Sequence, residues 1–270
     1  MFKISVTNQK GGVGKTVTTV NVGAALAQAG KRVLLVDLDP QGHLTDNLGL
    51  PHATEPATLA NALLGDWSGE LGDLIAVYRD NIHVIPTHPS MFLLEPQMYG
   101  AKVRNREQRL SKLLRYLDDA YDFCLIDCPP SLGALTDNGL VATGRRRGER
   151  GPFPGGVLIP VQAEDSTLNA IKLLFQQIST VEHEMELDLD IIGMVINLYD
   201  GRRGRIATST RSALHSMEGV KVVGEIGDRT VVREGWRLHL PVVEHDPKSD
   251  AAHGYTELAD YIVKHAGVQK

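Results

Sequence analysis

A glycine-rich run with two lysines, Lys10-Gly11-Gly12-Val13-Gly14-Lys15-Thr16, is the part of the sequence best suited to do chemistry. It follows a short apolar run typical of a strand and precedes an alanine- and valine-rich run typical of a helix. Glycine lets the backbone approach a phosphate closely, and the N–H groups at the start of a helix attract an anion. The pattern therefore predicts a phosphate-binding loop, and the alternative is a glycine-rich turn that carries a solvated lysine.

The residues of this loop have separate expected roles. We expect Lys15 to contact the β- and γ-phosphates of a nucleotide as a catalytic cation, and the hydroxyl of Thr16 to bind Mg²⁺. Gln9 stands where the strict form of the motif has its first glycine, so the loop is a variant. The predicted nucleotide-binding residues of the loop are Gly11, Gly12, Val13, Gly14, Lys15, Thr16 and Val17.

Two aspartates follow apolar runs that are typical of buried parallel strands. Asp39 comes after residues 33–38, and Asp127 comes after residues 123–126. Open α/β folds bind ligands at the carboxyl edge of the sheet, beside the first strand–helix turn. We therefore expect Asp127 to hold Mg²⁺ through a bound water, and Asp39 to orient or polarise the attacking water as a catalytic residue. For either aspartate the alternative is a strand-end cap or a turn.

Short apolar runs alternate with helical patterns along the chain, which predicts an α/β fold with a mostly parallel sheet and helices on both faces. No linker divides the chain, so we expect a single P-loop NTPase domain over residues 1–270. The irregular run 144–156 is dense in glycine, arginine and proline, and we expect it to be an exposed, inserted basic loop. The expected strands are 2–7, 32–38, 81–86, 123–127, 157–161, 190–198 and 220–226, and the expected helices are 16–29, 106–120, 166–181, 211–218 and 256–265.

Composition excludes several classes of protein. Hydrophobic residues make up 42% of the 270 residues, which is ordinary for a globular chain and argues against disordered and fibrous classes. Two cysteines do not make a disulfide scaffold, and they fit a reducing, cytoplasmic location. No apolar run reaches the roughly 18 residues of a membrane-spanning helix. The net charge of −5 argues against nucleic acid, but the stretches 144–156 and 200–240 each carry a net positive charge, so a local anion-binding face remains open.

Six blocks of the sequence resemble ParA-type partition ATPases of the ParA/MinD superfamily. Residues 10–16 resemble the deviant Walker A motif, which has a second lysine before its double glycine, and residues 37–41 and 127–131 resemble the switch I and switch II motifs. The remaining blocks are 157–163, 194–200 and 242–249. The resemblance covers nearly the whole chain. It implies a Mg²⁺- and ATP-dependent ATPase with slow, switch-type turnover, acting in plasmid or chromosome segregation.

The resemblance also implies roles for particular residues. Lys10 corresponds to the lysine that reaches across an ATP-sandwich homodimer to the phosphates of the partner, where it counts as catalytic. Asn197 corresponds to the residue whose side-chain amide contacts adenine in the family. Pro160 and Pro247 correspond to residues that shape the pocket of the base. The alternatives are a solvated loop lysine for Lys10, a strand-end residue for Asn197 and purely structural prolines.

Members of the ParA family bind DNA without sequence preference as ATP dimers, and a ParB-like centromere-binding protein stimulates their hydrolysis. Such binding requires arginine and lysine side chains that contact phosphates. The resemblance therefore implies a nucleoid-associated protein, although any single arginine can equally be a solvated surface residue. The candidate DNA-binding residues are Arg202, Arg203, Arg205, Arg211, Arg229 and Arg233, with Arg237 beside them.

Three further readings remain open at this stage. The inserted run 144–156 carries four arginines and is either a disordered surface loop or an additional arm that contacts phosphates. A membrane-associated relative such as MinD needs a basic amphipathic C-terminal helix, whereas residues 255–265 carry Glu257 and Asp260 against Lys264, so we expect no membrane binding. The other alternative is a ParA-like ATPase that positions protein cargo.

Overall fold

The computed structural model describes residues 1–164, 166–199, 205–227 and 230–268. Within these residues the main sheet has eight strands in the order β10-β9-β7-β1-β5-β2-β4-β3. Neighbouring strands run parallel, except that β3 pairs antiparallel with β4. The strands of this sheet are β1 (Phe2–Val6), β2 (Val33–Asp37), β3 (Ala76–Arg79), β4 (Ile82–Ile85), β5 (Phe123–Asp127), β7 (Gly155–Val161), β9 (Ile191–Tyr199) and β10 (Val222–Gly227).

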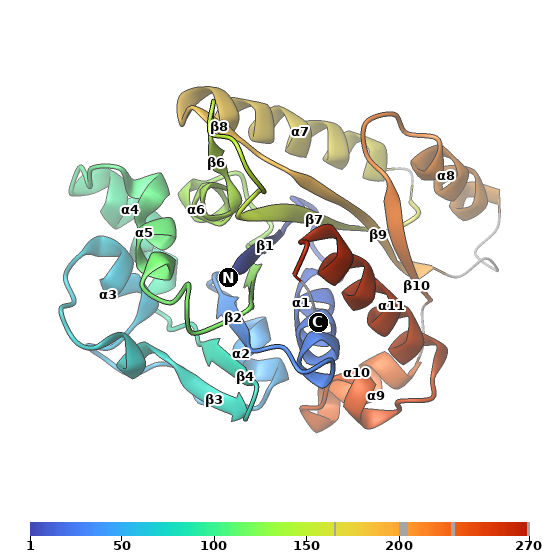
Figure 1. Ribbon diagram of the computed structural model, residues 1–270, viewed down its shortest axis with the longest axis horizontal. Coiled ribbons are helices and arrows are strands. Elements are labelled where there is room, and N and C mark those ends of the chain that lie inside the picture. Colours follow the sequence, from blue (N-terminus) through green and yellow to red (C-terminus); the bar gives the residue numbers. More distant parts are fainter. Residues whose placement is uncertain (165, 200–204, 228–229, 269–270) are drawn as a thin grey trace.

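Helices cover both faces of this sheet (Figure 1). Helices α1, α10 and α11 lie on one face, and α5, α6 and α7 lie on the other. The helices are α1 (Lys15–Gln28), α2 (His43–Asn47), α3 (Leu59–Leu64), α4 (Met91–Gly100), α5 (Arg109–Arg115), α6 (Ala134–Thr143), α7 (Thr167–Glu184), α8 (Arg205–His215), α9 (Thr230–Leu238), α10 (Val242–His245) and α11 (Asp250–His265).

The central strands are buried on both faces because successive side chains of a strand point to opposite sides of the sheet. On β2, Val33 and Leu35 belong to the core under α1 and α11, whereas Leu34 and Val36 belong to the core under α5 and α6. Every residue of β1, β2 and β5 is buried. The strand ends are therefore held rigidly, and the loops that follow them have fixed starting points.

The predicted α/β class, with a mostly parallel sheet and helices on both faces, is confirmed. The sequence patterns missed α6 because all of its residues except Asp137 are buried, which leaves no apolar stripe to recognise. They missed α3 because it is only six residues long, and α4 because Pro96 lies inside it. The helix expected over 106–120 is shorter, since a 3₁₀ turn at Arg106–Gln108 precedes α5.

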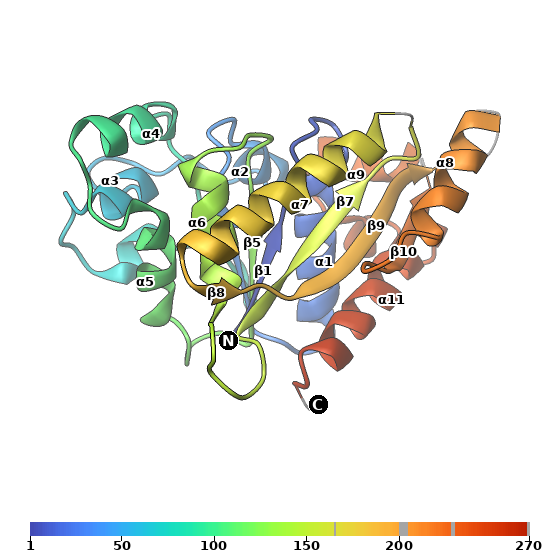
Figure 2. The same ribbon diagram turned by 90° about the horizontal axis from the view of Figure 1, so that it is seen from above.

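The expected loop over 144–156 is partly a strand. Arg145 and Arg146 form β6 (Arg145–Arg146), which pairs antiparallel with β8 (Leu187–Asp188), while residues 146–152 are exposed. Ion pairs explain the pairing, because Arg145 and Arg147 lie 3.6 and 3.7 Å from the carboxylate of Asp188. In Figure 2 this segment, drawn in yellow-green, extends beyond the edge where the strands begin, near both chain termini.

Candidate functional site

The predicted phosphate loop joins β1 to α1 at the edge where the parallel strands end. Gly12 and Gly14 have φ values of 75° and 88°, a region that favours glycine. Gly14 also caps α1, and a Cβ there would lie 2.8 Å from the side-chain nitrogen of Asn197. The first turn of α1 contains no acidic residue, so its N–H groups remain attractive to an anion.

The loop opens onto a pocket of about 520 Å³, a volume typical of small-ligand sites. The pocket brings together most of the predicted nucleotide-binding residues with Asp39 and Asn197, although these lie far apart in the sequence. Val13 is buried beneath the loop. The predicted residues that line the pocket are Gly11, Gly12, Gly14, Lys15, Thr16, Val17, Asp39 and Asn197.

Thr16 and Asp127 form the predicted metal-binding pair. The hydroxyl of Thr16 donates a hydrogen bond of 2.7 Å to a carboxylate oxygen of Asp127. Burial and the neighbouring carboxylate of Asp37 raise the pKa of Asp127 well above its usual range. A hydroxyl and a carboxylate that gains from a nearby cation are suitable ligands for Mg²⁺, directly or through water, so the residues present fit this ion.

Lys15 is the buried cation of the pocket. Its Nζ atom donates a 3.2 Å hydrogen bond to the carbonyl of Lys10. Burial lowers the pKa of Lys15, and the carboxylates of Asp127 and Asp39 act in the opposite direction. A desolvated ammonium group without a fully compensating partner gains strongly from a phosphate, which supports the role predicted for Lys15.

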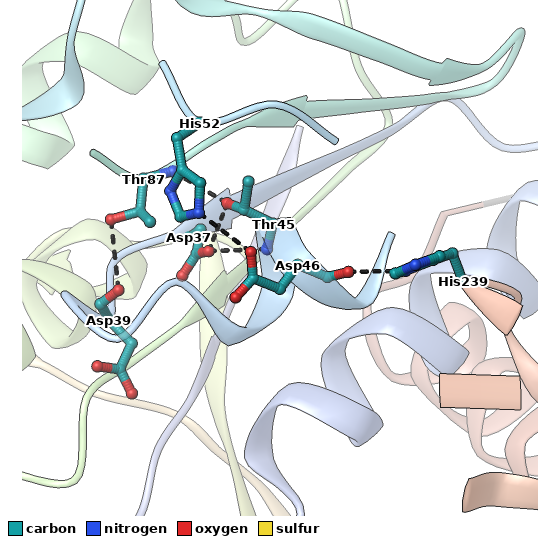
Figure 3. Close-up of polar contacts among 7 residues, drawn as sticks. All are labelled: Asp37, Asp39, Thr45, Asp46, His52, Thr87 and His239. Atoms are coloured by element: carbon teal, nitrogen blue, oxygen red, sulfur yellow. Dashed lines mark hydrogen bonds and ion pairs between the residues drawn. The ribbon is translucent and has the colours of Figure 1, made fainter. Parts of the chain in front are cut away.

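Two further carboxylates lie at the end of β2 (Figure 3). Asp37 is fully buried and accepts hydrogen bonds from the backbone N–H and the hydroxyl of Thr45, at 2.8 and 2.6 Å. Its other oxygen has no hydrogen-bond partner among the described residues, and burial raises the pKa of Asp37 to about 7. Asp39 lines the pocket and accepts a 3.0 Å hydrogen bond from the backbone N–H of Gln41. Asp39 is thus positioned to contact a ligand, whereas Asp37 organises α2.

Helix α2 connects this strand end to the end of α9. The carbonyl of Asp46 accepts a 2.8 Å hydrogen bond from Nδ1 of His239, and the carboxylate of Asp46 contacts His52 at 3.0 Å (Figure 3). On the other side of α2, the hydroxyl of Thr45 donates a hydrogen bond to Asp37 and accepts one from the backbone N–H of Thr87. Helix α2 is therefore in hydrogen-bond contact both with the end of β2 and with His239, the residue that follows α9.

Lys10 lies outside the pocket of its own chain. Its Nζ atom donates hydrogen bonds to the carboxylate of Glu164 and, at 2.9 Å, to the hydroxyl of Ser166, both in the segment after β7. Its side chain is 24% exposed. The two lysines of the loop are thus directed to different places, Lys15 into the pocket and Lys10 onto the neighbouring loop.

Asn197 lines the pocket, whereas Pro160 and Pro247 do not. The side-chain amide of Asn197 is buried and donates to the carbonyl of Val13 at 3.1 Å and to the hydroxyl of Thr18 at 2.8 Å, so it supports the phosphate loop. Its side-chain oxygen has no hydrogen-bond partner among the described residues. Pro247 is exposed and does not line the pocket, and the carbonyl of Pro160 accepts a hydrogen bond from Asn8.

Sequence reasoning missed the aromatic wall of the pocket. Trp236 and Tyr255 line it, and Trp236 makes an edge-to-face contact with His43, with ring centres 6.2 Å apart. These rings offer an apolar surface to the base of a nucleotide. The available signal was the position of Trp236, one of two tryptophans in the chain, in an otherwise polar stretch.

The predicted DNA-binding arginines are only partly placed. Arg202, Arg203 and Arg229 lie outside the described residues, and Arg205 is described only as the first residue of α8. Arg211 on α8 forms an ion pair of 2.9 Å with Glu225, which His215 also contacts. Arg233 is exposed on α9 and lines the pocket together with Arg237. Arg233 and Arg237 therefore lie at the nucleotide pocket, whereas Arg211 is paired with Glu225 and does not line it.

The chain is similar over most of its length to chromosome-partitioning proteins of bacteria. A family model described as an AAA domain matches residues 1–191. The sporulation initiation inhibitor protein Soj of Bacillus subtilis is 35% identical over 275 residues, covering 95% of this chain and 96% of Soj. The chromosome partitioning protein ParA of Myxococcus xanthus is 34% identical, covering 97% of this chain and 87% of ParA.

Solved structures agree with this similarity. A cobyrinic acid a,c-diamide synthase from Mycobacterium smegmatis, solved with ADP and magnesium, has a TM-score of 0.80 and 30% identity, covering 100% of this chain and 97% of that one. The septum site-determining protein MinD of Pyrococcus horikoshii, solved with Mg-ADP, has a TM-score of 0.74 and 26% identity, covering 99% and 98%. Within the described part of the present chain, no helix combines the length and apolarity needed to cross a bilayer.

Proposed function

The chain belongs to the Soj and ParA group of chromosome-partitioning ATPases within the AAA-domain family, and from this premise we propose that it is a Mg²⁺- and ATP-dependent switch ATPase of DNA segregation. Two copies close face to face around two ATP molecules, and the dimer binds nucleoid DNA without sequence preference. A ParB-like partner stimulates hydrolysis, which opens the dimer and releases the DNA. The proposed location is the cytoplasm, on the nucleoid.

The observation that carries the proposal is the division between the two lysines of one loop. Lys15 lines the pocket, whereas Lys10 contacts Glu164 and Ser166 outside it. A second lysine that does not serve its own pocket supports a role toward the phosphates of another copy. Such a contact makes dimerisation depend on the nucleotide, because without its charge the facing cations would repel one another.

The geometry supports an in-line hydrolysis at the γ-phosphate. The oxygen of water forms a bond to the γ-phosphorus while the bond to the β–γ bridging oxygen breaks. Asp39 orients the water, and Lys15 together with Lys10 of the partner subunit neutralises the charge that develops on the phosphate oxygens. When bound by the hydroxyl of Thr16 and, through water, by Asp127, Mg²⁺ supplies further positive charge at this point.

The DNA-binding surface is proposed around α8 and α9. Arg233 is exposed at the nucleotide pocket, and His239, which follows α9, donates a hydrogen bond to the carbonyl of Asp46 on α2. A dimer presents each such residue twice, which allows a chain with a net charge of −5 to attract DNA locally. The proposed DNA-contacting residues are Arg202, Arg203, Arg205, Arg211, Arg229 and Arg233.

Membrane association is not supported by α11. Its apolar residues Tyr255, Leu258 and Ile262 are buried in the core against α1 and β10, so they are not available to a lipid surface. The remaining alternative is an ATPase of the same mechanism that positions protein cargo.

The test is co-sedimentation with DNA in ATP, in ADP and without nucleotide, repeated across salt concentrations. We expect DNA retention with ATP alone and a steep fall with salt, because phosphate contacts release counterions. Lys10→Ala is expected to bind ATP but to lose the dimer and the DNA. Lys172→Ala, an exposed lysine on the nearby α7, is the matched control and is expected to behave like the wild type. A Lys10→Ala protein with an unchanged dimer and unchanged retention would contradict the proposal.

A further inference from the structure

A second large cavity lies at the opposite edge of the sheet from the phosphate loop. It has a volume of about 580 Å³ and lies where the strands begin, between α5, the end of α6 and the segment that contains β6. In Figure 2 this is the edge that carries both termini and the yellow-green segment before β7. Nothing in the proposed ATPase mechanism uses this cavity.

The lining of this cavity is strongly basic. It contains two carboxylates, those of Asp118 and Glu149, and Lys3 pairs with Asp118 at 2.6 Å. Six basic residues from three separate segments line it, namely Lys3, Lys112, Arg115, Arg145, Arg146 and Arg150.

Four of these cations have no carboxylate partner within the described residues. They are all exposed and belong to two elements that approach from different sides, Lys112 and Arg115 on α5, and Arg146 and Arg150 around β6. Unpaired cations that converge on one cavity repel each other, and a bound anion relieves this repulsion.

Arg145 is held in place as a fixed member of this group. Its guanidinium group stacks over the ring of Phe153 at 3.9 Å and donates a 2.6 Å hydrogen bond to the carbonyl of Gly151. The carboxylate of Asp188 lies 3.6 Å away on its other side. Its buried Nε atom has no hydrogen-bond partner among the described residues, so the side chain retains a donor. An arginine oriented in this way loses little conformational entropy when it binds a phosphate.

The floor of the cavity is apolar. Val141, Ala142, Met185 and Leu187 contribute to it, while the cations lie around them. A concave site with an apolar floor and convergent charges is typical of small-molecule binding, and its volume suits a molecule of nucleotide size. A DNA duplex, by contrast, presents its phosphates along a convex surface, which matches a row of cations better than a converging group.

We propose that this cavity binds a small metabolite that carries two or more phosphate groups, with its phosphates between α5 and the β6 segment. The site is independent of the proposed ATPase function, because the two cavities share no residue. Binding would tie α5 to the β6 segment and so restrain the end of α6, which packs against β1 and β7.

The test is calorimetry on the full-length protein saturated with Mg-ADP, so that the phosphate loop is occupied. The probes are inorganic pyrophosphate and fructose 1,6-bisphosphate. We expect one site per chain, and the double variant Arg146→Ala with Arg150→Ala is expected to bind at least about tenfold more weakly, because hydrogen bonds to charged groups are lost. The matched control removes two exposed cations that do not line the cavity, Lys102→Ala with Arg104→Ala, and is expected to bind like the wild type.

Folding is checked by the melting temperature of each variant, and Lys112→Glu serves as a second variant on a different element. Weaker binding in both the double variant and Lys112→Glu, with the control unchanged, supports the proposal. No measurable heat from either probe in the wild type overturns it, and so does an equal loss in the control. A short DNA duplex that requires Arg146 and Arg150, and that neither phosphate compound displaces, would assign the surface to DNA and would also overturn the proposal.

Discussion

At the edge of the sheet where the strands end, the lysines of the phosphate loop already contact oxygens of the protein, whereas at the opposite edge several cations have none. Lys15 donates to the carbonyl of Lys10, and Lys10 donates to Glu164. At the edge where the strands begin, cations such as Arg146 and Lys112 have no carboxylate partner in the described part of the chain. At the first edge both lysines of the loop thus have an oxygen partner within the chain, whereas at the second edge part of the basic group has no carboxylate partner among the described residues.

This difference has a thermodynamic consequence. A ligand at the nucleotide edge must replace contacts that the protein makes with itself, so its apparent affinity is reduced by the cost of breaking them. In the proposed dimer, Lys10 must likewise leave Glu164 before it can contact the phosphates of a second copy. At the opposite edge Lys3 and Arg145 are also paired, but a ligand that contacts the exposed cations without a carboxylate partner would replace mainly solvent and relieve their repulsion.

The largest expected effect is on ATP hydrolysis at the edge where the strands end, and it should leave ligand binding at the opposite edge unchanged. Asp39→Ala is expected to lower the rate of ATP hydrolysis about 100-fold, because a positioned carboxylate that orients a proton-transferring water contributes at least this much. Affinity for ATP is expected to remain, since Asp39 contacts Gln41 and not the phosphate loop. Single-turnover hydrolysis measures the rate, and Asp46→Ala, an exposed aspartate on α2, is the control.

The affinity of the Asp39→Ala protein for pyrophosphate at the opposite edge is measured as well and compared with that of the wild type. If Asp39→Ala changes that affinity as well, the two edges are coupled and the comparison between them fails. Turnover at the wild-type rate would remove Asp39 from catalysis.

The next largest expected effect is a pH dependence of the free energy of unfolding, caused by Asp37. Burial raises the pKa of Asp37 to about 7 in the folded protein, whereas an unfolded aspartate titrates near 4. The folded state therefore binds more protons than the unfolded state between these values, so the free energy of unfolding falls as the pH rises through this window. Between pH 5 and pH 8 the wild type is expected to lose about 2 kcal/mol relative to Asp37→Asn, which cannot ionise.

Urea denaturation at several pH values, without nucleotide and with a chelator present, measures this difference. Asn at position 37 keeps an oxygen that can accept the hydrogen bonds of Thr45, so it is a suitable isosteric variant. Parallel stability curves for the wild type and the variant across this pH range would show that Asp37 does not ionise with a raised pKa.

The nucleotide edge could be predicted from the sequence because its residues follow local rules. The run 10–16 combines glycines with a lysine between a strand and a helix, and Asp39 and Asp127 each follow a buried strand. In a parallel sheet such strand ends meet at one edge, so separate local patterns were sufficient to place them together. The mostly parallel fold followed from the same alternation of apolar runs and helical patterns.

Contacts between distant residues could not be predicted in the same way. Trp236 reaches the pocket only because α9 packs beside it, and Asn197 supports the phosphate loop from a strand more than 180 positions away. The basic cavity depends on Lys3, α5 and the β6 segment meeting at one edge, and composition alone indicated only that 144–156 is basic. These arrangements depend on which surfaces pack together, and spacing along the chain does not determine that.

The smallest expected effect tests whether the contact between Lys10 and Glu164 restrains the first edge. Glu164→Gln removes the charge that holds Lys10, and an exposed ion pair of this kind is worth about 0.2 to 1 kcal/mol. The ATP-bound dimer is therefore expected to become roughly two- to thirtyfold tighter, because less free energy is spent in releasing the two Lys10 side chains of each dimer. Sedimentation equilibrium with a non-hydrolysable ATP analogue measures this, and Glu184→Gln, an exposed glutamate on α7, controls for net charge. A weaker dimer in Glu164→Gln, with Glu184→Gln unchanged, would mean that Glu164 helps to position Lys10 for the partner, and the contrast between a restrained edge and an open one would then no longer hold.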